Sequence, residues 1–149
     1  MTILAIDPGP EKSAWLLFDP GSHIPIPVHG IHANDDVLPI VAAYAGQADI
    51  VIEGFSSYGM PVGRETFDAV RWSGRFEQAA YPHDAHYILR RDVKLHLCGQ
   101  VRAKDSNVRV ALIDKYGGPS VVRKGGPLYR IKADEWAALA LAVTFSETR

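Results

Sequence analysis

Cysteine is almost absent from this chain, since its 149 residues include only Cys98. One thiol excludes a disulfide framework within the chain and a zinc site made of cysteines alone. Long apolar runs are absent too. None approaches the roughly 18–20 residues of a membrane-spanning helix, and the N-terminus has no basic start followed by an apolar stretch. We therefore expect no membrane contact and a cytoplasmic location.

Internal repeats and low-complexity tracts are also missing, which argues against a solenoid or a disordered linker. The composition is that of an ordinary soluble globular protein, with 47% hydrophobic and 22% charged residues. At this length we expect residues 1–149 to form a single domain around one core.

Charge is distributed unevenly, although the net charge is only -1. Residues 1–63 carry one cation and seven acids, which gives -6. Residues 90–132 carry eleven cations and three acids, which gives +8. This asymmetry favours a basic surface that faces a polyanion, with an ordinary mixed surface as the alternative.

Short apolar runs bounded by turn residues predict an α/β fold, with a mixed sheet that has helices on its faces. We expect the strand at 49–53 to be central and next to the first strand. The predicted strands cover residues 2–7, 13–18, 27–32, 49–53 and 86–89. The predicted helices cover residues 34–45, 64–81, 93–99, 105–116 and 133–147, with loops at 54–63 and 117–130.

Three acids stand at the ends of predicted elements. Asp7 follows an apolar strand and precedes Pro8-Gly9, Glu53 ends a second apolar strand, and Asp134 opens an Ala/Leu-rich helix. Carboxylate oxygens are the ligands that Mg²⁺ prefers, so the set predicts a hard-cation site. Taken singly, Asp7 is equally consistent with a turn-capping residue, and Glu53 with an acid that points to solvent.

These residues resemble the motifs of a known family. Ile6-Asp7-Pro8-Gly9, Ile52-Glu53 and the run from Asp134 to Ala142 are similar to the RuvC-type Holliday-junction resolvases of the RNase H-like superfamily. Val93-Lys94, then Gly99, then the stretch from Lys104 to Val108 look like the basic region before the last helix of that family. The resemblance covers nearly the whole chain and depends on the order and spacing of the motifs together.

The short chain, the loop at 117–130 and the Trp136–Leu139 ending look most like the phage-encoded members. The resemblance implies an RNase H-like fold with a five-stranded sheet. It also implies a dimeric, Mg²⁺-dependent endonuclease that cuts four-way DNA junctions symmetrically, in a bacterial or phage-infected cell. Phe67, Val70, Arg71 and Gly74 on the second helix are our candidates for the dimer contact.

One position departs from the family pattern. The family places a second acid three residues after the first on the final helix, where both share a face, and here that position is Ala137. Glu135 lies next to Asp134 but about 100° round the helix. The usual set of four carboxylates is therefore incomplete, and Glu135 is a further candidate metal ligand.

Hydrolysis of a phosphodiester by two metal ions needs them about 3.5–4 Å apart. We expect Asp7 to bridge two Mg²⁺ ions, with Glu53 on one and Asp134 on the other, and Mn²⁺ as a substitute. Phe55 and Tyr58 follow Glu53, where they can stack on opened bases or fold onto the core. The expected phosphate contacts are Arg90, Arg91, Lys94, Arg102, Lys104, Arg123, Lys124, Arg130 and Lys132.

Three functions are compatible with this pattern. The first is a junction-resolving endonuclease acting in recombination or phage DNA processing. The second is another nuclease of the same superfamily that acts on branched or RNA-containing substrates. The third is a junction-binding protein without catalytic activity, because the carboxylate set is incomplete at Ala137.

Overall fold

The apolar run at the start of the chain forms β1, the middle strand of a five-stranded sheet. The computed structural model describes residues 1–22 and 28–149. The strands are β1 (Ile3–Asp7), β2 (Lys12–Phe18), β3 (Val28–Ala33), β4 (Asp49–Gly54) and β5 (Ala85–Leu89). The helices are α1 (Asn34–Tyr44), α2 (Arg64–Ala80), α3 (Arg90–Cys98), α4 (Asp105–Lys115), the 3-10 helix η1 (Pro119–Val122) and α5 (Glu135–Thr148).

The strands lie in the order β3-β2-β1-β4-β5, which confirms the predicted mixed five-stranded sheet and the α/β class. β1 is antiparallel to β2 and parallel to β4. β4 therefore lies next to the first strand and has neighbours on both sides, as we expected for the strand at 49–53. β5 is in turn parallel to β4. Because β1, β4 and β5 run in the same direction, their carboxyl ends meet at one edge of the sheet.

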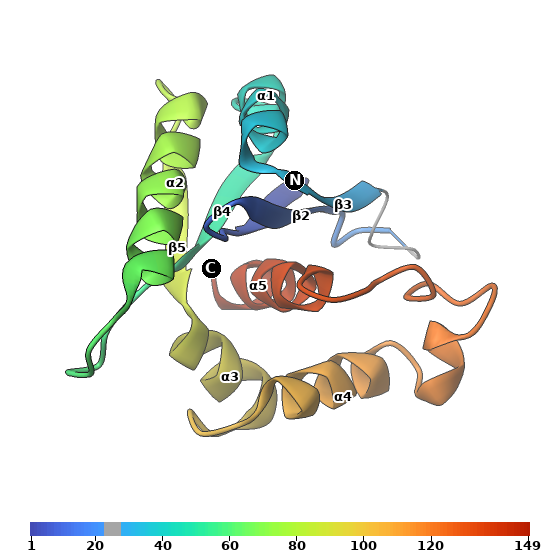
Figure 1. Cartoon of the computed structure of the whole chain (residues 1–149). Helices are drawn as coiled ribbons and strands as arrows, with labels where there is room; N and C mark the ends of the chain where they lie inside the picture. The colour runs from blue at the N-terminus through green and yellow to red at the C-terminus, as the bar shows by residue number, and fades with distance from the viewer. Residues whose placement is uncertain (23–27) are drawn as a thin grey trace.

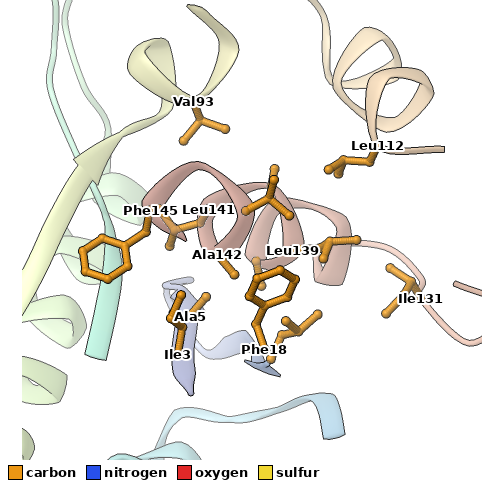
Figure 2. Close-up of a cluster of buried hydrophobic side chains, with 14 of the residues drawn as sticks. Ile3, Ala5, Phe18, Val93, Leu112, Ile131, Leu139, Leu141, Ala142 and Phe145 are labelled. Carbon is orange, nitrogen blue, oxygen red and sulfur yellow. The ribbon is translucent and has the colours of Figure 1, made fainter. Parts of the chain in front are cut away.

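Helices cover both faces of the sheet (Figure 1). α1 and α2 pack on one face against apolar side chains of β1 and β4, among them Leu4, Ile6 and Ile52. α5 packs on the opposite face, and α3 and α4 lie beyond it. Figure 2 shows Ile3 and Ala5 of β1 on one side of α5, with Val93 of α3 and Leu112 of α4 on the other.

This arrangement buries α5 more completely than its sequence pattern predicts. Every residue from Ala138 to Phe145 is buried, not only those on one face of the helix. The reason is that the sheet covers one side of the helix and α3 with α4 covers the other. The small Ala side chains along α5 allow both layers to approach it closely. Among the described residues, no helix is long and apolar enough to cross a membrane.

The turn after Asp7 is fixed by buried polar groups. The Gly9 N–H donates to Ser13 Oγ at 3.1 Å, and Asn34 Nδ2 donates to the Gly9 carbonyl at 2.9 Å. Both Ser13 and Asn34 are almost fully buried. A Cβ at Gly9 would lie 2.2 Å from the Lys12 carbonyl oxygen, so only glycine fits there. The end of β1, and with it Asp7, is therefore held rigidly.

Some predicted boundaries differ from the structure. The helix expected at 93–99 begins at Arg90, directly after β5, because the chain turns into it without a loop. Phe67 and Val70, two of our candidates for the dimer contact, are exposed, and α2 packs on the core through Ala69, Ser73 and Phe76. Residue 27, predicted to begin the third strand, lies outside the described residues.

Thr144 of α5 offers a test of this packing. Its Oγ1 is buried and finds no hydrogen-bond partner among the described residues. Since an unsatisfied buried hydroxyl costs about 1–3 kcal/mol, Thr144→Val should stabilise the fold by about 1 kcal/mol. The free energy of unfolding in urea would measure this. Thr148→Val is the control, because Thr148 Oγ1 donates to the Thr144 carbonyl and its loss should not stabilise. A Thr144→Val variant less stable than the parent would contradict the packing.

Candidate functional site

Two carboxylates meet at the edge of the sheet where the parallel strands end. Asp7 is the last residue of β1, and Glu53 stands one residue before the end of β4. Both side chains are largely buried, at 11% and 10% exposed, and they are close enough that Glu53 raises the pKa of Asp7. The prediction that these acids lie side by side follows directly from the strand pairing.

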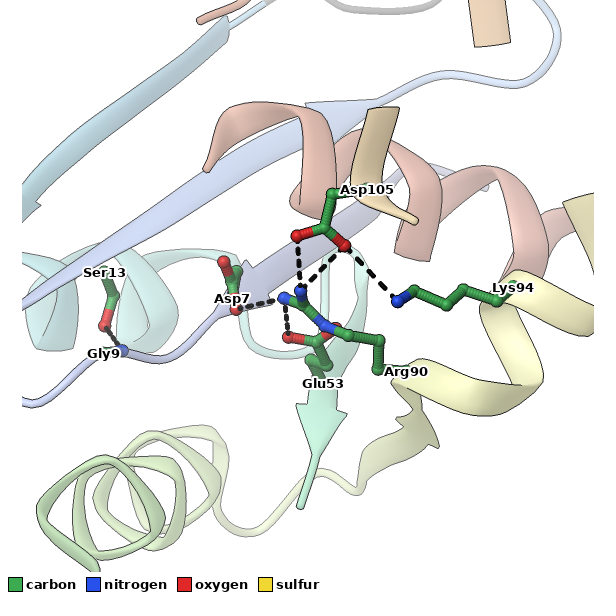
Figure 3. A network of polar contacts seen from close by, with 7 residues as sticks. All are labelled: Asp7, Gly9, Ser13, Glu53, Arg90, Lys94 and Asp105. Carbon is green, nitrogen blue, oxygen red and sulfur yellow. Dashed lines mark hydrogen bonds and ion pairs between the residues drawn. The ribbon is translucent and has the colours of Figure 1, made fainter. Parts of the chain in front are cut away.

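Arg90 lies between this pair of carboxylates and a third, that of Asp105 (Figure 3). Its Nε and Nη2 donate to the two oxygens of Glu53 at 2.9 and 3.1 Å. Nη1 donates to both oxygens of Asp105 at 3.2 and 3.3 Å, and Asp7 Oδ1 lies 3.9 Å from Nη2. One guanidinium therefore contacts carboxylates from β1, β4 and the first turn of α4.

The electrostatics of the cluster show its shortage of positive charge. Burial raises the pKa of Asp7 well above its ordinary value, and the adjacent Glu53 and the charge of Asp134 raise it further. Arg90 acts in the opposite direction on the pKa of Asp7, but it does not cancel these effects. Burial lowers the pKa of Arg90, yet its hydrogen bonds and charge contacts with the carboxylates raise that pKa overall. Arg90 thus remains charged.

A small cavity of about 80 Å³ opens beside this cluster, between the start of α5 and the α3–α4 pair. Three acids line it, namely Glu53, Asp105 and Asp134, together with Arg90 and Lys94. The Nζ of Lys94 lies 3.6 Å from Asp105 Oδ1. Ala137, at the position where the resemblance implies a further acid, is also in the wall of this cavity.

The donor set fits a divalent cation. Four carboxylates (Asp7, Glu53, Asp105 and Asp134) face two cationic side chains, so the cluster lacks the charge of one divalent ion. Arg90 already acts as a stand-in cation on three of them. Within residues 1–22 and 28–149, no three His, Cys, Asp or Glu side chains converge closely enough to hold an ion. The carboxylates surround the guanidinium instead.

Glu135 lies elsewhere, and its prediction as a metal ligand is not supported by the structure. Its Oε2 is 2.7 Å from His29 Nδ1, and its Oε1 accepts the backbone N–H of Lys132 at 2.9 Å. Asp134 lines the small cavity, whereas Glu135 lines a separate groove next to β3 and the segment before α5. The reason is the helical rotation between neighbours, about 100° per residue, at the start of α5.

The predicted phosphate-binding residues separate into two groups. Arg90 and Lys94 belong to the carboxylate cluster, so in this structure they neutralise acids rather than form part of an open surface. The others lie exposed on α3, on α4 and its flanks, and on the segment before α5: Arg91, Arg102, Lys104, Arg123, Lys124, Arg130 and Lys132. Arg130 and Lys132 line the groove of about 800 Å³ that also contains Lys12 and Glu135.

The loop after β4 presents its aromatic side chains to solvent. Tyr58 is 52% exposed, and the guanidinium of Arg91 lies 5.9 Å from its ring centroid. Tyr58 also has a positive φ of 51°, which is unusual for a residue with a side chain. Phe55 is 37% exposed and lines a groove with Tyr87 and Val70. The alternative in which both aromatics fold onto the core is therefore wrong for Tyr58.

Sequence reasoning missed Arg90 as a partner of the carboxylates, and it missed Asp105 altogether. The parallel pairing of β5 with β4 sets Glu53 opposite Ile88, so the residues that follow β5 arrive at the same edge. A helix starting directly after Leu89 would have indicated Arg90. Asp105 carried no local signal beyond its place in the first turn of a predicted helix.

The contacts of Arg90 predict a pH-dependent loss of stability in Arg90→Gln. Loss of the guanidinium leaves two buried carboxylates without a counterion, which raises the pKa of Asp7 further in the folded state. Since a carboxyl whose folded pKa is raised loses stability as pH rises, the deficit should be largest near pH 8 and small near pH 5. We expect the free energy of unfolding to fall by about 1–2 kcal/mol near pH 8. The loss is no larger because the Arg90 side chain is 41% exposed and solvent screens its charge.

Urea unfolding at both pH values measures the deficit. Arg71→Gln is the matched control, because Arg71 is exposed and pairs only at 3.9 Å with Asp68. Added Mg²⁺ should restore stability to Arg90→Gln and not to the control. Equal deficits for Arg90→Gln at both pH values would exclude Arg90 as the counterion of these acids.

Of the comparisons with known proteins, the one with solved structures found matches. No family model matches the sequence, and no curated protein matches it. The Thermus thermophilus RuvC structure superposes with a TM-score of 0.69 at 16% identity, covering 98% of this chain and 93% of that one. T. thermophilus RuvC in complex with a Holliday junction substrate superposes with a TM-score of 0.71 at the same identity and coverage. The chain therefore has a RuvC-like fold of the RNase H type.

Proposed function

We propose that this protein is a structure-specific endonuclease that resolves four-way DNA junctions with the help of divalent cations. The observation that carries this proposal is the adjacent pair Asp7 and Glu53, at the carboxyl ends of neighbouring parallel strands in a RuvC-like fold. Support comes from the second solved neighbour, which is a RuvC bound to a Holliday junction substrate.

Asp7, Glu53 and Asp134 are the residues that would hold the cations. A pair of Mg²⁺ ions, or Mn²⁺ in their place, supplies an activated water and stabilises the leaving oxygen. Asp7 is fixed by the rigid turn after β1, and Glu53 by its strand, so both can hold their positions through the reaction. Asp134 completes the set from the start of α5, where Ala133 has a positive φ of 49° that sets the entry angle of the helix.

The basic residues of segment 90–132 would bind the phosphate backbone. Arg91, Arg102 and Lys104 are exposed on α3 and just before α4, and Arg123, Lys124, Arg130 and Lys132 are exposed on the segment before α5. Phosphate contacts supply affinity without choosing a sequence, as recognition of a branch by shape requires. Tyr58 and Phe55, both exposed on the loop after β4, would stack on bases opened near the branch point.

A homodimer would provide two such sites for the two equivalent strands of a junction. The face that we assign to this contact includes the exposed Phe67 and Val70 of α2 and Tyr87 of β5. Gly74 leaves open space on the same helix, because a Cβ there would meet nothing within 4 Å. Exposed apolar side chains next to a flat glycine position favour close approach of a second copy.

One observation favours a second candidate, a junction-binding protein without nuclease activity. Arg90 lies where a cation would have to bind, and Ala137 removes one carboxylate of the family set. A guanidinium that permanently neutralises Asp7 and Glu53 would leave a site that binds DNA but does not cut it. Cleavage of a four-way junction in Mg²⁺ or Mn²⁺ distinguishes the two candidates.

Asp7→Asn should abolish cleavage of a four-way junction and leave binding to it unchanged. Asn keeps the shape of the side chain but removes the charge that a bridging ligand needs, whereas affinity comes from the basic segment. Cleavage in Mg²⁺ and a mobility-shift assay on junction, duplex, single-stranded and RNA-containing substrates measure both properties. Asp36→Asn, an exposed acid on the opposite side of the sheet, is the control. An Asp7→Asn variant that still cuts would remove Asp7 from the mechanism.

Binding should also weaken steeply with salt, because each neutralised phosphate releases counterions. The slope of log affinity against log salt is about -0.9 per phosphate contact on duplex DNA. Replacing Arg123 and Lys124 with Ala should therefore make the slope shallower by roughly one to two units. Arg75→Ala, which removes a cation packed against Trp72 beside α1, should leave it unchanged. A double variant with the parental slope would place this pair outside the DNA footprint.

A further inference from the structure

The small cavity is lined both by Ala137, where the family pattern has an acid, and by another acid, Asp105. Ala137 contributes only a methyl group to the cavity wall, so α5 presents Asp134 there and no second acid. Asp105, at the first position of α4, lines the same cavity. The two positions lie on different helices, but both border the space that Glu53 and Asp134 enclose.

Asp105 is already bound to the cluster through one group. The guanidinium that contacts both oxygens of Glu53 also contacts both oxygens of Asp105, at 3.2 and 3.3 Å. Because one planar guanidinium contacts both carboxylates at once, the carboxylates of Glu53 and Asp105 lie within the span of a single cation. Figure 3 shows the Asp105 carboxylate directed toward Asp7 and Glu53, with Arg90 in between.

The local structure leaves Asp105 free for such a role. α4 begins with the Lys104 N–H donating to Asn107 Oδ1 at 2.9 Å, so the side chain of Asp105 is not used to cap the helix. The Asp105 side chain is 75% exposed, and within residues 1–22 and 28–149 its one other close cation is Lys94, at 3.6 Å. It can therefore move toward the cavity at little packing cost.

We propose that Asp105 supplies the carboxylate that α5 lacks at Ala137, and that it completes the cation site when Arg90 moves aside to a DNA phosphate. This inference rests on the proposed function, since it assigns a further ligand to the same site. It explains how an active site can persist in a chain whose last helix has lost an acid. It also assigns Arg90 a role in the free protein, where it keeps the carboxylates together.

An ordinary structural role for Asp105 makes a different prediction. An acid in the first turn of a helix stabilises it through the helix dipole, and Asp92 stands in the first turn of α3 in the same way. Asp92 pairs with its neighbour Arg91 at 3.8 Å and does not line the cavity. Asp92→Asn is therefore the matched control, because it removes a first-turn acid without touching the site.

The test is a Mn²⁺ titration of the free protein, followed by the electron paramagnetic resonance signal of unbound Mn²⁺. Asp105→Asn should weaken Mn²⁺ binding about tenfold or more, in line with losses at metal sites, while Asp92→Asn should leave it unchanged. The double variant Asp105→Asn, Ala137→Asp should recover most of the lost affinity. Rescue from α5 identifies a shared ligand position, because helix stability in α4 cannot be restored from there.

The same variants are then titrated with Mn²⁺ in an Arg90→Gln background, which lacks the competing guanidinium. Their order of Mn²⁺ affinity should stay the same, and each should bind Mn²⁺ more tightly. Asp105→Asn with unchanged Mn²⁺ affinity in both backgrounds would overturn this inference. If the parent chain nevertheless cleaves the junction, the proposed function stands and only the role of Asp105 is lost. A parent chain that neither binds Mn²⁺ in either background nor cleaves would overturn both.

Discussion

The need of two buried carboxylates for positive charge governs this structure. Asp7 and Glu53 are brought into contact by the parallel pairing of β1 and β4, and their mutual repulsion must be offset for the sheet edge to be stable. Arg90 meets that need with a two-pronged hydrogen bond to Glu53 and a close approach to Asp7. A charge so placed stabilises the site in the free protein.

The rest of the fold brings the groups of this site together from different elements. α5 lies between the sheet and the α3–α4 layer (Figure 1), so its first residues enter the site while its remainder is held by core packing. Arg90 begins α3 and Asp105 begins α4, which places both at the mouth of the cavity rather than in the core. Asp7 and Glu53 come from strands, whereas Arg90, Asp105 and Asp134 come from helix starts.

The proposed nuclease and the proposed binder differ in one physical respect. In the nuclease Arg90 would leave the carboxylates when DNA binds, and in the binder it would stay. A polyanion such as DNA offers phosphates that compete with carboxylates for a guanidinium. In the proposed complex, the basic residues of segment 90–132 would bring those phosphates close to Arg90. Binding of DNA and entry of a cation would then be linked, because each becomes easier once the other has occurred.

The sequence by itself determined the α/β class, the strands and the acids that end them. Apolar runs with turn residues predicted β1 and β4, and a parallel pair necessarily brings Asp7 and Glu53 together. The all-apolar character of α5 was also visible, although its burial on both sides was not. These features follow from local patterns, namely short apolar runs that end at turn residues.

Only the tertiary structure decided which charges meet. Arg90 was counted among exposed phosphate contacts, Glu135 among metal ligands, and Asp105 was not singled out as a site residue. The structure instead pairs Arg90 with three acids and Glu135 with His29. Partners of this kind lie far apart in the chain, up to 106 residues for His29 and Glu135. Their meeting depends on the packing of whole helices, which no local periodicity encodes.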